Sequence, residues 1–129
     1  MKHNIKNNYG KWALVAGAAE GLGRAFSLDL AGKGLNLILV DKQEDLLNEL
    51  ATDLEATLRV QIKTLYLDLS LKDSVERIID VIRETGCRLL VYNAAFSRVL
   101  KFLKNDPEML DCYVQVNIRT PLQLVHAFC

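Results

Sequence analysis

Residues 11–26, KWALVAGAAEGLGRAF, decide the fold of this chain. An apolar run ends at Ala16, and a helix-like pattern resumes after three glycines, Gly17, Gly21 and Gly23. The order strand, glycine-rich turn and helix predicts a phosphate site, because the first N–H groups of a helix and the positive end of its dipole face an anion. Gly17 permits the tight turn, Gly21 gives a pyrophosphate room to approach, and Gly23 allows close packing of helix on strand.

An acidic residue, Asp41, follows the next apolar run, and its distance from the glycines is informative. Asp41 ends the run 35–40 and lies 18 residues after Gly23, close to where a dinucleotide-binding βαβ unit places the acid that holds the adenosine ribose. A carboxylate there accepts hydrogen bonds from both ribose hydroxyls and repels a 2′-phosphate. Asp41 and Glu20 therefore favour NAD, whereas Lys42 favours NADP. The alternative is an aspartate that merely begins a loop.

Strand and helix patterns alternate along the chain, with no repeat or linker that would mark a second domain. We expect strands near residues 12–16, 35–40, 61–67 and 88–92. Such alternation requires crossover connections and a parallel sheet covered on both faces. The predicted fold is α/β, a Rossmann-like three-layer αβα domain with strand order 3-2-1-4, ended before the later strands. Residues 1–9 are expected to be a flexible leader, and residues 10–129 to form the dinucleotide-binding domain.

The last helix is predicted to begin at Asp106, an N-cap residue followed by Pro107 at the first helical position. Its apolar stripe contains the polar Asn117, whose side chain either hydrogen-bonds a neighbouring element or serves the site. Pro121 lacks an N–H and must leave the carbonyl of Asn117 without its helical partner, and a freed carbonyl beside a kink can hold a water. Because the sequence stops inside this amphipathic pattern, we expect a chain cut from something longer.

The composition excludes several classes of function. Lys plus Arg and Asp plus Glu number 16 each, and no basic patch is interleaved with aromatic residues, so nucleic acid is not an expected partner. No apolar run approaches the length of a membrane span and the polar start lacks the centre of a signal peptide, so we expect no membrane partner. Cys87, Cys112 and Cys129 lack metal-ligand spacing; we expect no metal site and reduced thiols in a cytoplasmic protein.

The spacing Gly-x-x-x-Gly-x-Gly resembles the glycine loop of the short-chain dehydrogenase/reductase family. The resemblance continues in Asp68 between two leucines, in the run Asn-Ala-Ala at 93–95 and in Asn117, and it extends from residue 11 to residue 129. Residues 9–15 and 34–37 look most like the branch that includes 3-oxoacyl and hydroxysteroid reductases. The family implies an oxidoreductase that transfers a hydride between a nicotinamide cofactor and a small carbonyl or alcohol substrate, in a homo-oligomer.

The resemblance also assigns roles to residues. Asp68 is expected at the adenine amino group, with Leu69 near the ring; without the resemblance, this stretch would be only a strand end, with Ser70 or Asp73 as the helix cap. Asn117 is expected to be catalytic, holding a water that links a catalytic lysine to solvent. The expected cofactor is NAD, with NADP as the alternative. The expected cofactor-binding residues are Gly17, Ala19, Glu20, Gly21, Leu22, Gly23, Asp41, Lys42, Asp68, Leu69, Asn93, Ala94 and Ala95.

Three residues depart from the family pattern and put the rigidity of the site in question: Ala16 for threonine, Tyr92 for asparagine and Ala95 for glycine. No tyrosine is followed by lysine four residues later, so the family's Tyr-x-x-x-Lys pair is missing and the chain alone is expected to be inactive. Two alternatives stay open. One is a nucleotide-binding module without catalysis, and the other is a fragment of a methyltransferase that uses S-adenosylmethionine.

Overall fold

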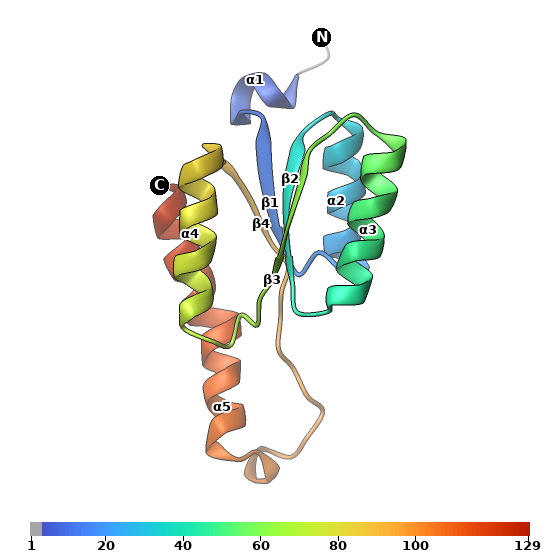
Figure 1. The fold of residues 1–129 in the computed structure, drawn as a ribbon. Helices are drawn as coiled ribbons and strands as arrows, with labels where there is room; N and C mark the ends of the chain where they lie inside the picture. The colour runs from blue at the N-terminus through green and yellow to red at the C-terminus, as the bar shows by residue number, and fades with distance from the viewer. Residues whose placement is uncertain (1–3) are drawn as a thin grey trace.

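A computed structural model describes residues 4–129 and consists of a four-stranded parallel sheet with helices on both faces (Figure 1). The strands pair in the order β3-β2-β1-β4, which confirms the predicted order. Every pair is parallel, with Trp12 opposite Asn36 and Ala13 opposite Leu89. The strands are β1 (Trp12–Ala16), β2 (Asn36–Asp41), β3 (Ile62–Tyr66) and β4 (Leu89–Tyr92).

Helices α2 and α3 cover one face of the sheet, and α4 and α6 cover the other (Figure 1). The short helix α1 (Ile5–Tyr9) lies within the segment expected to be a flexible leader, and residues 1–3 fall outside the described part of the chain. No helix within residues 4–129 is long and apolar enough to cross a membrane. The longer helices are α2 (Gly21–Gly32), α3 (Glu44–Thr57), α4 (Asp73–Thr85), α5 (Pro107–Val114) and α6 (Thr120–Phe128).

The alternation of side chains along β2 builds a separate core on each face of the sheet. Leu37 and Leu39 belong to the cluster under α2 and α3, while Ile38 and Val40 belong to the cluster under α4 and α6. All four side chains are fully buried, as expected for a central parallel strand. Burial of each contributes about 1.5–3 kcal/mol relative to an exposed side chain. The carboxyl ends of β1 and β2, which carry the glycine loop and Asp41, therefore rest on a closely packed base.

A capping side chain sets where α5 begins, whereas none does so at α4. The Asp106 carboxylate accepts a hydrogen bond of 2.8 Å from the Met109 N–H, with Pro107 in the first turn, which confirms the predicted start of α5. At α4 the sequence-based expectation was wrong, because the N-cap residue is Lys72 and no side chain caps the helix there. The Ser70 hydroxyl is engaged instead by a carboxylate of the pocket described below.

The last helix is interrupted rather than continuous. A π-turn, η2 (Gln115–Arg119), separates α5 from α6, and the Thr120 N–H donates to the Gln115 carbonyl, five residues earlier. Pro121 accounts for the break, because it has no N–H to continue the α-helical ladder. The Gln115 amide donates to the Thr120 hydroxyl (3.1 Å), which in turn donates to the carbonyl of Leu69 (3.0 Å). The break is thus tied to the loop that follows β3.

Candidate dinucleotide-binding site

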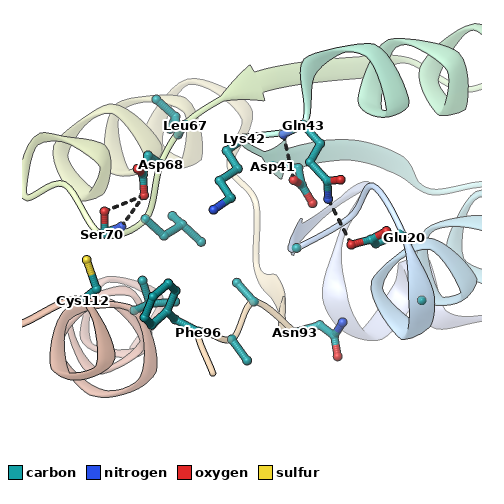
Figure 2. Close-up of a pocket in the computed structure, with 16 residues that line it drawn as sticks. Glu20, Asp41, Lys42, Gln43, Leu67, Asp68, Ser70, Asn93, Phe96 and Cys112 are labelled. Atoms are coloured by element: carbon teal, nitrogen blue, oxygen red, sulfur yellow. Dashed lines mark hydrogen bonds between the residues drawn. The ribbon is translucent and has the colours of Figure 1, made fainter. Parts of the chain in front are cut away.

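A pocket of about 450 Å³ opens at the carboxyl ends of the strands (Figure 2). It lies beside β1 and β4, where strand order reverses and where open α/β sheets place their ligands. Ala19, Leu22 and Gly23, which the resemblance assigned to the cofactor, are not among its lining residues. The lining residues are Gly17, Glu20, Gly21, Asp41, Lys42, Gln43, Leu67, Asp68, Leu69, Ser70, Asn93, Ala94, Ala95, Phe96, Cys112 and Val116.

The three glycines of the first loop meet different constraints. Gly17 has φ +78°, and a Cβ there would lie 2.7 Å from the backbone nitrogen of Ala94. A Cβ on Gly23 would lie 1.8 Å from the Gly17 carbonyl oxygen, so the start of α2 rests directly on the loop. Gly21 has φ +59° and faces open space. The structure therefore confirms the close packing expected at Gly23 and leaves room beside Gly21 for an anion.

The beginning of α2 offers unoccupied N–H groups to that space. Its N-cap residue is Glu20, whose side chain makes no capping hydrogen bond within the described chain. The first N–H groups of a helix have no partners inside the helix and attract anions. A pyrophosphate above Gly21 would meet these groups together with the positive end of the helix dipole.

Asp41 holds the glycine loop as well as facing the pocket. Its Oδ2 accepts a hydrogen bond from the Ala19 N–H (3.0 Å) and its Oδ1 accepts one from the Gln43 N–H (3.0 Å), and the residue is only 9 % exposed. Each carboxylate oxygen keeps a further lone pair for a ligand hydroxyl. Asp41 thus begins a turn, which was the alternative to a role in ribose binding, and its carboxylate can still accept a hydrogen bond from a ligand in the pocket. The link to Ala19 was not foreseen from the sequence.

A second contact joins the same two loops at the pocket rim. The Gln43 side-chain amide donates to a carboxylate oxygen of Glu20 (3.2 Å), and Figure 2 shows this bond beside Asp41. Lys42 extends into the space between Asp41 and Asp68 (Figure 2). The charged residues that line the pocket are thus three carboxylates and one ammonium, which makes the lining net negative before any ligand binds.

Asp68 stands across the pocket from Asp41 with its carboxylate fixed by its own turn. The Ser70 N–H (2.9 Å) and hydroxyl (2.7 Å) both donate to Oδ1 of Asp68. Burial opposes ionisation of this group, but the two Ser70 hydrogen bonds and the positive charge of Lys42 together hold the pKa of Asp68 below its ordinary value. Asp68 is therefore an ionised hydrogen-bond acceptor at neutral pH, which suits a contact with an amino group.

The side chain of Asn117 hydrogen-bonds a neighbouring element. It accepts from the Phe96 N–H (2.9 Å) and donates to the Phe96 carbonyl (2.8 Å), which fixes the loop after β4. Asn117 does not line the pocket, and Phe96 does. Of the two roles considered for this side chain, the structure shows the hydrogen bonds to a neighbouring element. The role in a proton relay stays a prediction.

Sequence reasoning missed several lining residues. Cys112 and Val116 are four residues apart and share one helical face just before Asn117, a spacing that would have identified them. Gln43 and Phe96 carried no comparable signal, because they reach the pocket only through the paths of their loops. Within residues 4–129, no group of three or more His, Cys, Asp or Glu side chains is arranged to hold a metal ion.

Comparisons with known proteins agree with this geometry. The family model described as short chain dehydrogenase matches residues 11–129. A 7beta-hydroxysteroid dehydrogenase of Clostridium sardiniense is 33% identical over 125 residues, covering 97% of this chain and 48% of that protein. A very-long-chain 3-oxoacyl-CoA reductase of Meyerozyma guilliermondii is 34% identical, covering 89% of this chain and 35% of that protein.

Solved structures show the same likeness. A structure concerned with 7beta-hydroxysteroid dehydrogenase stereoselectivity superposes with a TM-score of 0.90 at 29% identity, over 97% of this chain and 50% of that one. A metagenomic short-chain oxidoreductase in complex with NADP has a TM-score of 0.83 at 26% identity, over 93% of this chain and 55% of that one. This chain spans about half the length, or less, of the curated relatives it matches. It belongs to the short chain dehydrogenase family.

Proposed function

We propose that this chain is the NAD(H)-binding part of an oxidoreductase that transfers a hydride between the nicotinamide and a carbonyl or alcohol substrate. Membership of the short chain dehydrogenase family and the Rossmann-like fold support this class of enzyme and a nicotinamide cofactor. The observation that carries the choice of NAD is the position of Asp41 at the carboxyl end of β2, with Glu20 beside it. The family match leaves the methyltransferase alternative without support.

Each part of the dinucleotide has residues in the pocket that suit it. The pyrophosphate would lie over Gly21 at the start of α2, the adenosine ribose at Asp41, and the adenine between Asp68 and Leu69. When bound, the nicotinamide supplies or accepts the hydride, and the chain's own residues bind and orient the cofactor. The loop 93–96, held by Asn117, borders the pocket beside β4.

The proton that accompanies the hydride needs an acid, and we infer that no residue among 4–129 is positioned to supply it. Tyr92 directly precedes the lining residue Asn93, but burial raises the pKa of Tyr92 to about 12 and its hydroxyl donates to the Val116 carbonyl (2.6 Å). An acid works best when its pKa lies near the operating pH. We therefore expect residues 1–129 to bind the dinucleotide without catalysing hydride transfer. An assay with NADH and a panel of ketones and aldehydes tests this; turnover that a substitution within the chain abolishes would contradict it.

The cofactor preference is tested by removing the carboxylate. Asp41→Ala should narrow the gap between NADH and NADPH affinity by about tenfold, because a charge repelling the 2′-phosphate disappears. The same variant loses the hydrogen bond to the Ala19 N–H, which should weaken the binding of both cofactors. The quantity to compare is therefore the ratio of the two dissociation constants. Asp53→Ala, an exposed aspartate on α3, is the matched control. A wild-type preference for NADPH would overturn the assignment and point to Lys42.

We also propose that the chain associates with further copies. The outer edge of β4 has no neighbouring strand in the described chain, and an unpaired edge can template another strand. Apolar side chains on η2 and α6, among them Ile118, Leu122 and Val125, are half exposed or more. Sedimentation should show a dimer or larger assembly, and a stable monomer at high concentration would refute this.

Cys87, Cys112 and Cys129 are free thiols, in keeping with the reducing cytoplasm that we expect for this protein.

A further inference from the structure

The loop between β4 and α5 presents apolar side chains to solvent. We call residues 98–104, RVLKFLK, the basic–apolar loop. Val99 is fully exposed, Leu103 is 90 % exposed and Phe102 is 71 % exposed. Single exposed apolar residues are ordinary on a protein surface, but several large ones gathered in one short loop mark an interaction site.

Hydrogen bonds at both ends hold this loop in its outward position. The Tyr113 hydroxyl accepts from the Arg98 N–H (2.9 Å) and donates to the Arg98 carbonyl (3.3 Å). The Asn105 amide donates to the carbonyls of Lys101 (3.3 Å) and Phe102 (3.1 Å), closing the 3₁₀ turn η1 (Phe102–Lys104). The exposed side chains are therefore carried by an anchored loop.

The loop itself carries three positive charges and no negative charge. Arg98, Lys101 and Lys104 alternate with the apolar residues, and the sequence has no acid between Glu84 and Asp106. Within residues 4–129 these three cations form no ion pair, and the Arg98 guanidinium lies over the Phe96 ring, 5.8 Å from its centroid. The nearest acid in the sequence, Asp106, accepts a hydrogen bond as the N-cap of α5. Figure 1 shows the loop projecting from the end of the molecule opposite α1, clear of the sheet.

We propose that the basic–apolar loop docks this protein onto the surface of a bilayer that contains anionic lipid. Phe102 and Leu103 would enter the boundary between headgroups and acyl chains, and the three cations would pair with lipid phosphates and carboxylates. The same loop of a second copy is a poor occupant, because two sets of three cations repel. The expectation of no membrane partner rested on the lack of a spanning run, and surface docking needs none.

Co-sedimentation with vesicles tests the electrostatic half of the proposal. The 129-residue chain should bind vesicles of phosphatidylcholine with phosphatidylserine and bind poorly to phosphatidylcholine alone. Changing Arg98, Lys101 and Lys104 together to Gln should weaken binding to the anionic vesicles roughly 100-fold, since each basic residue near the surface contributes about 5-fold. The matched control changes Lys11, Arg59 and Lys63, exposed cations near the other end of the sheet, to Gln and should bind as wild type does.

The apolar half needs its own variants. Phe102→Ser with Leu103→Ser should also release the chain from anionic vesicles, whereas Leu122→Ser, an exposed leucine on α6, should not. Circular dichroism confirms that each variant is folded. Equal binding to neutral and anionic vesicles, or wild-type binding by either loop variant, would overturn the proposal. Absence of vesicle binding, with self-association that the Phe102/Leu103 variant abolishes, would overturn it too and make the loop an interface between copies.

Discussion

Replacing Gly23 by alanine should separate α2 from the glycine loop. The new Cβ would lie 1.8 Å from the Gly17 carbonyl oxygen, 1.2 Å short of the 3.0 Å that real Cβ contacts respect. That carbonyl cannot simply rotate away, because the N–H of the same peptide unit, that of Ala18, donates to the Val40 carbonyl (3.2 Å). The helix must therefore move off the strand by about that shortfall. Forced overpacking of this kind costs about 1–3 kcal/mol or more, against a propensity gain of up to about 1 kcal/mol.

The same helix supplies the control. A Cβ on Gly32, the last residue of α2, meets nothing within 4 Å, so Gly32→Ala should leave the free energy of unfolding unchanged or raise it by up to about 1 kcal/mol. Urea unfolding followed by circular dichroism measures both variants, and calorimetric titration with ADP measures the pocket. Gly23→Ala should lose about 2 kcal/mol of stability and bind ADP at least tenfold more weakly. The reasoning fails if Gly23→Ala stays within about 0.5 kcal/mol of wild type and binds ADP normally.

Tyr92→Phe should lower the free energy of unfolding by about 1 kcal/mol by removing a partly buried hydrogen bond. Because burial raises the pKa of Tyr92 to about 12, wild type should lose stability as pH rises from 10 to 12, and the variant should lose less in urea titrations. Asn117→Ala should speed hydrogen exchange at the Phe96 amide, which NMR reports, with Asn105→Ala as control. Ser70→Ala should raise the pKa of Asp68 in an NMR titration, because the hydroxyl that donates to this carboxylate is removed. An unchanged pKa would refute the role of that hydrogen bond.

Periodicity and spacing were sufficient for the fold. The strand predicted at residues 12–16 coincides with β1, and the other three strands differ from the expected bounds by one residue at one or both ends. Apolar runs and glycine positions carry that information locally, because a parallel strand must be buried on both faces. The kink expected at Pro121 likewise followed from its missing N–H, although the form it takes, a π-turn, did not.

The contacts that shape the pocket were beyond a local reading. Asp41 bonds Ala19, 22 residues away, and Asn117 bonds Phe96, 21 residues away, and both contacts depend on where two loops end after the chain folds. Sequence spacing predicts which residues gather at one edge of the sheet. It does not predict which of these residues form hydrogen bonds with each other. The hydrogen bonds between the Asn117 side chain and Phe96 could therefore be identified only from the structure.

The π-turn between α5 and α6 has an evolutionary consequence. A π-turn amounts to one residue inserted into an α-helix, so deleting a single codon between Gln115 and Arg119 would restore regular winding. The wide turn absorbs the extra residue, so the segment beyond it would keep its phase around the helix axis. Leu124 would stay in the core after such a deletion. The same deletion inside the regular winding of α5 or α6 would turn everything beyond it by about 100°. We therefore expect lineages to tolerate the loss of one residue in this turn better than the loss of one elsewhere in the last helix.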